Sequence, residues 1–243
     1  MGNSALHILS FLIMFIGLQG CASYTTPAAG VDIAAIGDAD IAELMAVEPA
    51  SQFPARVAVV RVQEPGYYTA TNTSFGAGNY SVVTTRDIES EADLLRLSQQ
   101  PQLAGVAPVG RLLLPSHLQS IKDLRLAAAK LKADMLLLYT VDTAFHVEGT
   151  ALGPLSAITL GFLPNKQAFV TATTAGMLVD VRTGYVYGIA EASSREEQRA
   201  SMWNTSAAID EARVDAEAAS FKSFVNEFEQ LWAQTLAQYK KAD

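Results

Sequence analysis

The run Met135–Val141, with the sequence MLLLYTV, is the feature that most limits the possible folds of this chain. Its apolar side chains would face both sides of an extended chain, and a strand of this kind is covered on both faces of its sheet. Ala133 and Asp134 precede the run, and Asp142 follows it. We therefore expect a buried strand in a sheet that carries helices.

The residues before this strand predict a βαβ unit. Gly105–Leu114 has the pattern of a second strand, which Pro115 closes. Ser120 and Asp123 have the spacing of a helix N-terminus, where a hydroxyl and a carboxylate accept hydrogen bonds from free backbone N–H groups. The helix should continue to Lys132 with an apolar stripe of Leu118, Ile121, Leu124, Ala128 and Leu131. Strand, helix and strand in so short a stretch indicate a right-handed crossover.

Apolar runs and turn signals predict the other elements. They are a short helix over 38–47, a strand over 56–62, a helix between Ser90 and Pro101, and strands over 169–181 and 185–190. The last two strands are joined by Arg182-Thr183-Gly184, a short turn whose glycine can adopt a positive φ angle. They predict a C-terminal β-hairpin.

A long helix is expected from Ala208 to Tyr239. Its apolar positions alternate spacings of four and three, which would suit a coiled coil: Val214, Ala218, Phe221, Val225, Phe228, Trp232, Thr235 and Tyr239. Phe224 and Leu231 widen this stripe, and aromatic side chains fit a coiled-coil seam poorly, so packing across a sheet is favoured. The predicted fold class is α/β: a mixed sheet with a βαβ unit, a C-terminal β-hairpin and a long C-terminal helix packed on the sheet.

Composition excludes several classes of function. The chain has 243 residues and a formal net charge of −8, whereas a nucleic-acid-binding protein needs a basic surface that displaces counterions from phosphate. We therefore expect no nucleic acid as partner. Half of the residues are hydrophobic, which is enough for a core of moderate size. One cysteine excludes an intrachain disulfide and a multi-thiolate zinc site.

The N-terminus has the pattern of a lipoprotein signal. Residues 1–20 contain no Lys, Arg, Asp or Glu, and Ile8–Leu18 is an apolar run of the length of a signal-peptide h-region, too short to span a membrane. The sequence Leu18-Gln19-Gly20-Cys21 follows, and it resembles the lipobox of bacterial lipoprotein precursors. The resemblance implies that the Cys21 thiol receives diacylglycerol, that cleavage occurs before it, and that the new amine is acylated. The stretch before the apolar run departs from the pattern because it lacks Lys and Arg.

The lipobox divides the chain into three expected parts. Residues 1–20 are the signal peptide, 21–50 hold the lipidated cysteine, a tether and a short helix, and 51–243 form one α/β domain. Three acyl chains would anchor the protein stably, since one alone binds a membrane only marginally. Ala22 follows the cysteine where Asp would favour the inner membrane, which by the same resemblance implies the outer membrane and a domain that faces the periplasm or outward.

Few residues suggest catalysis. After the signal peptide the histidines are His117 and His146, and neither belongs to a recognised hydrolase or metal motif. Asp134, Asp142 and Asp180 could converge at strand ends as a carboxylate or cation site, but capping of turns and strand ends explains them better. The charges at Arg195, Glu196, Glu197 and Arg199 are expected to form a solvated, ion-paired helix face. We expect no cofactor and no enzymatic activity.

Three segments resemble the family of rhombotarget lipoproteins. They begin at Ala133-Asp134, at Leu160-Gly161 and at Leu178, and the most specific is Asp180–Gly188, with the sequence DVRTGYVYG. The family name implies an association with rhomboid-type sortase systems, although this chain lacks the Gly-rich, hydrophobic and basic tail of their substrates. The order of elements is more distantly similar to the α/β domain of the curli-secretion lipoprotein and of activators of penicillin-binding proteins.

These observations favour a non-enzymatic, lipid-anchored envelope protein that acts through protein contacts. Two alternatives stay open: an oligomeric secretion or assembly component of the outer membrane, hence a homo-oligomer, and a periplasmic hydrolase that uses Asp142 or His146. The uncharged segment Ala151–Leu163 either adds to the core or forms a contact surface for another subunit, a partner or the bilayer. The residues expected on that contact surface are Leu155, Ile158, Leu160 and Phe162.

Overall fold

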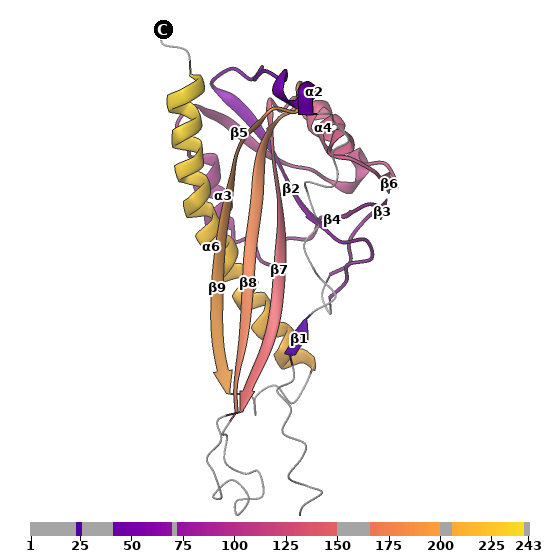
Figure 1. Ribbon diagram of the computed structural model, residues 1–243, viewed down its shortest axis with the longest axis vertical. Helices are drawn as coiled ribbons and strands as arrows, with labels where there is room; N and C mark the ends of the chain where they lie inside the picture. Colours follow the sequence, from indigo (N-terminus) through magenta and orange to yellow (C-terminus); the bar gives the residue numbers. More distant parts are fainter. Residues whose placement is uncertain (1–22, 26–40, 70–71, 150–165, 200–205, 241–243) are drawn as a thin grey trace, which may run out of the picture.

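A computed structural model describes residues 23–25, 41–69, 72–149, 166–199 and 206–240. The lipobox residues Leu18, Gly20 and Cys21 lie outside the described residues, as do Leu155, Ile158, Leu160 and Phe162 of the expected contact surface. The described chain forms three layers, with one mixed sheet between helices (Figure 1). This confirms the predicted α/β class, including the long C-terminal helix on the sheet.

The central sheet combines parallel and antiparallel pairs. Its strands run in the order β4 (Ser81–Val83), β2 (Ala55–Gln63), β7 (Met135–Gly149), β8 (Lys166–Asp180) and β9 (Val186–Arg199). Two further strands, β5 (Leu103–Pro108) and β1 (Ser23–Thr25), pair with β2 and β7 respectively. The β2–β5 and β2–β7 pairs are parallel, as a βαβ arrangement requires, and the other pairs are antiparallel. A separate small sheet joins β3 (Ala77–Gly78) to β6 (His117–Leu118).

Helices cover both faces of the sheet. On one face lie α3 (Glu91–Ser98) and the 34-residue α6 (Ser206–Tyr239), which follows the long strands β7, β8 and β9 (Figure 1). On the other face lies α4 (Ile121–Lys130), whose Leu124 is fully buried against the sheet. Two short elements, α2 (Ile41–Met45) and the 3-10 helix η2 (Arg111–Leu113), complete the fold.

Local signals at helix N-termini are confirmed. Ser120 and Asp123 form a reciprocal capping box at the start of α4, with the Asp123 carboxylate accepting from the Ser120 backbone N–H at 3.1 Å. Ser90 caps α3 because its hydroxyl accepts from the Asp93 backbone N–H at 3.1 Å. Both helices therefore begin where the sequence predicts.

The C-terminal helix packs on the sheet as predicted. Phe221, Phe224, Phe228 and Trp232 are all buried in the α6-side core. The close approach depends on glycine in β8: a Cβ atom at Gly176 would lie 2.6 Å from the Phe224 ring. A side chain at this position would push the helix away from the sheet.

The strand predicted over Gly105–Leu114 is wrong in its second half. β5 ends at Pro108, and Arg111–Leu113 form a 3-10 turn. The cause lies in β2, whose outer edge pairs with β5 up to Val59 and with β4 from Arg61 onward. Beyond Pro108 the edge of β2 is occupied by another strand, so β5 has no partner to continue.

The strands β7 and β9 are longer than predicted. β7 continues to Gly149 and β9 to Arg199, because polar and small residues alternate along a ladder in which each strand has a partner. The charges from Arg195 to Arg199 therefore lie on a strand, and the expected helix face is wrong. Successive side chains on β9 point to opposite faces of the sheet.

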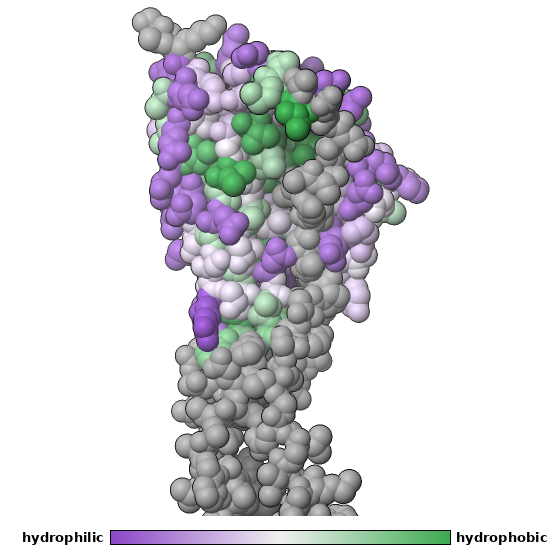
Figure 2. All heavy atoms as spheres, viewed as in Figure 1, coloured by the Kyte–Doolittle hydropathy of each residue, from purple (hydrophilic) through white to green (hydrophobic). Residues whose placement is uncertain are grey.

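Apolar side chains also reach the surface. Ile41 and Met45 in α2 and Ile189 in β9 are each more than 70% exposed, at 76%, 81% and 72%. In Figure 2 hydrophobic surface gathers at the upper end of the molecule, where Figure 1 places α2. As far as the described residues show, the apolar face expected for the helix over 38–47 is therefore exposed to solvent and not packed against the core.

Candidate functional site

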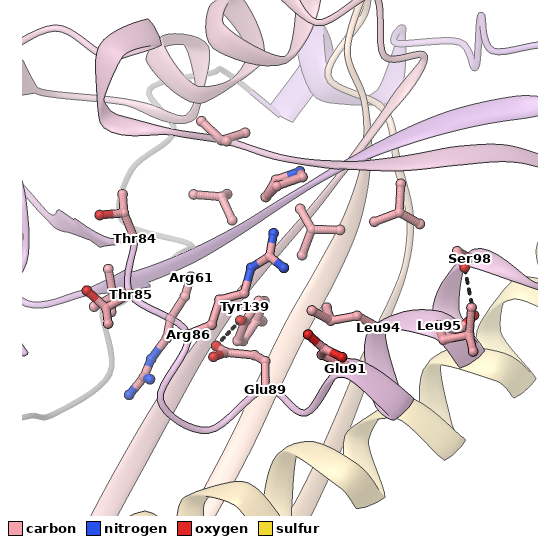
Figure 3. Close-up of a pocket in the computed structure, with 16 residues that line it drawn as sticks. Arg61, Thr84, Thr85, Arg86, Glu89, Glu91, Leu94, Leu95, Ser98 and Tyr139 are labelled. Carbon is pink, nitrogen blue, oxygen red and sulfur yellow. Dashed lines mark hydrogen bonds between the residues drawn. The ribbon is translucent and has the colours of Figure 1, made fainter.

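A pocket of about 310 Å³ opens at the edge of β2, at the point where the strand paired with that edge changes from β5 to β4. Val59 pairs with Pro108 of β5, whereas Arg61 pairs with Val83 of β4. The loop from β4 to α3, the helix α3 and Tyr139 of β7 complete the lining (Figure 3). The change of neighbour along one strand therefore creates the cavity.

The lining is apolar in one part and polar in another. Aliphatic side chains from the strands and α3 supply the apolar part: Val59, Val60, Val83, Val106, Val109 and Leu94. The polar part comes from the β4–α3 loop and the start of α3, with Arg86, Glu89 and Glu91 among its residues. An apolar cavity with a few polar groups is the usual form of a small-molecule site.

A buried network of charges lies directly behind the pocket. The Arg61 guanidinium binds Asp87 at 3.0 Å and Glu217 of α6 at 3.2 Å. Arg213, one helical turn before Glu217, binds the same carboxylate at 2.6 Å. The side chains of Arg61 and Glu217 are each 1% exposed, so the pair is removed from solvent. Such a pair is costly to break, because one charge would be left buried and unpaired.

Electrostatics fix the protonation states of this region. Burial alone would lower the pKa of the Arg61 guanidinium, but the neighbouring Tyr67, Glu217 and Glu89 raise it above its ordinary value. Burial raises the pKa of Tyr139 well above its usual range, and the adjacent Glu89 raises it further. Tyr139 is therefore a neutral phenol that donates a hydrogen bond to Glu89 Oε1.

The network holds the loop that carries the polar groups of the pocket. Asp87, which stands between Arg86 and Glu89 in the sequence, forms an ion pair with Arg61. Arg86 and Glu89 themselves line the cavity (Figure 3). Arg86 is exposed and makes no ion pair with any other residue that the structure describes. The second oxygen of Glu89, Oε2, is buried and accepts no hydrogen bond within the described chain. The pocket thus presents one cation without an ion-pair partner beside an apolar wall, whereas Glu89 Oε2 is closed off from solvent.

The three candidate aspartates do not converge. Asp180 and Asp134 lie at the same end of the sheet, where the Ser51 hydroxyl donates to the Asp180 carboxylate at 2.7 Å and to the Asp134 carbonyl at 3.0 Å. Asp142 pairs with Thr173 in the middle of the β7–β8 ladder and is exposed. The idea that Asp142 ends a strand is wrong, since β7 continues to Gly149.

Asp180 has the turn-capping role that the sequence favours. Its carboxylate accepts from the backbone N–H groups of Arg182 at 2.8 Å and Thr183 at 3.0 Å. Burial opposes ionisation, but hydrogen bonds from Ser51, Thr183, Ala50 and Tyr187 outweigh it and lower the pKa of Asp180 to about 2. No group of three or more acidic, His or Cys residues in the described chain could hold a metal ion.

The two histidines lie in different sheets. His117 is exposed in β6, with its Nδ1 3.2 Å from the Ser116 hydroxyl. His146 belongs to the far part of β7, where it pairs with Ser23 and Phe169. The described structure does not bring His117 and His146 together.

Sequence reasoning missed the residues of the pocket and its buried network. Arg61 stands between Val60 and Val62 in a strand that is buried almost throughout, and this was a usable signal of a paired internal charge. Arg213 and Glu217 have the i, i+4 spacing of a helical ion pair. Nothing in the sequence indicates that the strand with Arg61 and the helix with Arg213 and Glu217 come into contact.

Comparisons with known proteins give only distant structural likenesses. No family model and no curated protein matches the chain. Solved structures similar to it include a Xanthomonas campestris protein assigned to DUF330, with a TM-score of 0.36 and 12% identity over 78% of this chain and 90% of that one. Lipoprotein GNA1162 from Neisseria meningitidis has a TM-score of 0.27 and 16% identity, over 71% of this chain and 99% of its own. At these scores neither likeness supports an argument about function.

Within the described residues, no helix has both the length and the hydropathy needed to cross a membrane.

Proposed function

We propose that this chain is a bacterial envelope lipoprotein, anchored in the outer membrane through acylated Cys21, that acts without catalysis by contacting other envelope proteins. The lipobox Leu18-Gln19-Gly20-Cys21 carries the proposal, because it contains the only cysteine of the chain at the position that is acylated in lipoproteins. The resemblance to rhombotarget lipoproteins supports it and adds an association with a rhomboid-type sortase system.

The fold supports an orientation of the anchored domain. Strand β1 begins two residues after Cys21, which corresponds to at most about 7 Å of extended chain. Ser23 pairs with His146 and Thr25 with Ala144, near the end of β7 that is remote from Met135. The lipid would therefore hold the tip of the β7–β8 hairpin towards the membrane and the opposite end of the sheet away from it.

The proposed contact surface follows from this orientation. Residues 150–165 join Gly149 to Lys166, and these two residues pair at the end of the hairpin. The uncharged Ala151–Leu163 lies within this connection and outside the described residues. We place the contact surface of Leu155, Ile158, Leu160 and Phe162 at the membrane-proximal end, where its apolar side chains would meet the bilayer or an envelope partner.

Fractionation and fatty-acid labelling test the anchor. Wild type and Gln19→Ala, which changes the variable position of the lipobox, should be labelled and found with membranes. Cys21→Ala should lose the label and leave the membrane fraction. A labelled, membrane-bound Cys21→Ala protein would contradict the proposal.

A fluorescent probe tests the orientation. Because acylation blocks Cys21, an introduced cysteine is the single free thiol of the mature protein. Thr171→Cys lies on β8 near the hairpin tip, and Gln234→Cys lies near the C-terminal end of α6; both positions are exposed. A quencher in the lipid headgroups should quench a dye at position 171 more strongly than one at 234. Equal or reversed quenching would refute the orientation.

Charge substitutions test the contact surface. Ile158→Asp and Leu160→Asp should leave the thermal midpoint of the domain unchanged and weaken crosslinking to envelope proteins. A folded variant that keeps every crosslink rules the contact surface out, and a globally unfolded variant shows that the segment belongs to the core.

One observation favours the oligomeric alternative. The 14-residue strand β9 is the last strand of the described sheet, and a long edge strand is a template for pairing with another chain. Glu191 and Arg195 are exposed on the same face of β9, two positions on either side of Ser193. An antiparallel pair of β9 strands centred on Ser193 would place each Glu191 opposite the Arg195 of the other copy. Light scattering of the full-length protein in detergent, with Arg195→Glu as the variant, distinguishes a dimer from a monomer.

A further inference from the structure

We propose that this chain binds a second copy of itself, with α2 of one copy lying against the outer side of α4 and η2 of the other. Both surfaces are exposed and partly apolar, and they carry opposite charges. This self-association depends neither on the lipid anchor nor on contacts with other envelope proteins.

The stretch Gly105–Ala133, which includes η2 and α4, is basic within an acidic chain. It contains five Lys and Arg residues and one acidic residue, Asp123, whereas the whole chain has 17 basic and 25 acidic residues. The Asp123 carboxylate accepts hydrogen bonds from the backbone N–H groups of Gln119 at 2.8 Å and Ser120 at 3.1 Å at the start of α4. This part of the molecule therefore has the opposite sign to the net charge of the protein.

The outer side of α4 and the adjacent η2 form one surface, the basic patch. Lys122, Leu126 and Lys130 are spaced four positions apart and are all exposed, so they share the side of α4 that faces away from the sheet. The Lys130 ammonium group donates to the Leu113 carbonyl of η2 at 3.3 Å, which places η2 beside the end of α4. The basic patch consists of three cations and two leucines: Arg111, Lys122, Lys130, Leu112 and Leu126.

The two leucines of the basic patch lie largely in water. Leu112 is 94% exposed and Leu126 is 54% exposed. The three cations beside them form no ion pair with any described residue. Exposed apolar surface with a charged rim is typical of a protein contact site.

The short helix α2 carries the complementary surface. Ile41, Leu44 and Met45 have i, i+3, i+4 spacing and are 76%, 59% and 81% exposed, so they form one apolar helix face that is open to solvent. Glu43 and Glu48 are exposed in the same segment and form no ion pair with any described residue. Apolar anchors at this spacing are a common means by which a helix binds a protein surface.

A second copy of the chain accounts for both surfaces at once. Contact between α2 and the basic patch would remove apolar side chains from water and place Glu43 and Glu48 near cations. An anionic membrane would attract the basic patch alone and would repel the two glutamates. Because α2 and α4 lie at the same end of the molecule (Figure 1), one two-fold axis at that end allows each copy to use both of its surfaces.

Light scattering of the full-length protein in detergent, with micelles in excess over protein, measures the association. Wild type should form a dimer. Its dissociation constant should rise about tenfold or more between about 50 and about 500 mM NaCl, because salt screens exposed charges. A wild-type protein that stays monomeric up to about 100 µM would overturn the proposal.

Charge reversal tests which surfaces meet. Lys122→Glu with Lys130→Glu should weaken self-association by about tenfold or more, and so should Glu43→Lys with Glu48→Lys. An equimolar mixture of these two variants should associate like wild type, because each α2 then meets a patch of opposite charge. A mixture that stays monomeric, or a reversed variant that associates as tightly as wild type, would overturn the proposal.

Two controls carry charge changes away from both surfaces. Lys222→Glu with Lys240→Glu makes the same change in net charge at exposed positions in and just after α6, and should leave the association unchanged. Arg195→Glu should also leave it unchanged, which separates this contact from pairing of β9 strands. All substituted side chains are exposed, so every variant should keep the thermal midpoint of wild type. Loss of the dimer in either control would overturn the proposal.

Discussion

The carboxylate of Asp180 accepts a hydrogen bond from the backbone N–H of Ser51 at 2.7 Å, although 129 positions separate the two residues. The same oxygen accepts from the Ala50 N–H at 2.9 Å and the Tyr187 hydroxyl at 2.9 Å. The turn after β8 is thereby tied to the segment that leads into β2. One side chain thus fixes the start of the domain to its C-terminal hairpin.

Replacement of Asp180 by Asn should lower stability in a pH-dependent way. The folded-state pKa of about 2 is below the ordinary 3.8, so the ionised carboxylate stabilises the fold above about pH 4. This contribution is lost as the pH falls towards 2, and it corresponds to about 2 kcal/mol in the free energy of unfolding. Urea denaturation at pH 6 and at pH 2.5 should show a large difference between wild type and variant only at pH 6.

Removal of the central carboxylate of the buried network should destabilise the protein strongly. Glu217→Ala leaves Arg61 and Arg213 buried without their shared partner, at an expected cost of about 3 to 5 kcal/mol. Glu229→Ala breaks the Arg96–Glu229 pair, whose side chains are about one third exposed, and should cost less than about 1 kcal/mol. Chemical denaturation of both variants measures the difference, and equal losses would contradict the role assigned to Glu217.

Truncation of the α6 face tests its place in the core. Phe228 is 1% exposed and stacks near Trp232, with ring centroids 6.1 Å apart. Phe228→Ala should lower the free energy of unfolding by about 3 to 5 kcal/mol. Ile189→Ala, at a side chain that is 72% exposed, is the matched control and should change it by less than about 0.5 kcal/mol. An unchanged midpoint for Phe228→Ala with loss of an oligomer would place this face at a subunit contact.

A single methyl group at Gly176 should disturb the contact between β8 and α6. The added Cβ would lie 2.6 Å from Phe224 and 3.1 Å from the Leu138 carbonyl oxygen, and overpacking of this kind costs about 1 to 3 kcal/mol. Gly110→Ala has no atom within 4 Å of its new Cβ and serves as the control. The thermal midpoint should fall for Gly176→Ala and stay near wild type for Gly110→Ala.

The parts of the fold that the sequence predicts are those in which a local pattern and the tertiary packing agree. The buried run Met135–Val141 lies in the central strand β7, and the aromatic stripe of α6 faces the sheet. Both were predictable because hydrophobic periodicity indicates which side chains become buried on folding. Ser120 and Asp123 mark the start of α4 because their interaction is confined to one turn.

The parts that the sequence does not predict depend on distant partners. β9 extends through Arg199 because β8 lies beside it, whereas its own polar residues resemble a charged helix face. β5 ends at Pro108 because β4 occupies the next part of the β2 edge. The pocket requires Arg61, Asp87 and Glu217 to meet, and they come from a strand, a loop and a helix up to 156 positions apart.

If Cys21 carries the proposed lipid, the three residue pairs between β1 and β7 would also set how far the domain can move from the membrane. While Ser23–Thr25 are paired, the hairpin tip stays within a few residues of Cys21. If these pairs open, the chain between Cys21 and the start of α2 at Ile41 can extend to about 70 Å. Pairing of these three residues therefore decides whether the tether between Cys21 and the domain is short or long. A substitution that weakens the pairing, such as Tyr24→Pro, would increase the distance that the domain can reach from the proposed anchor without altering the core.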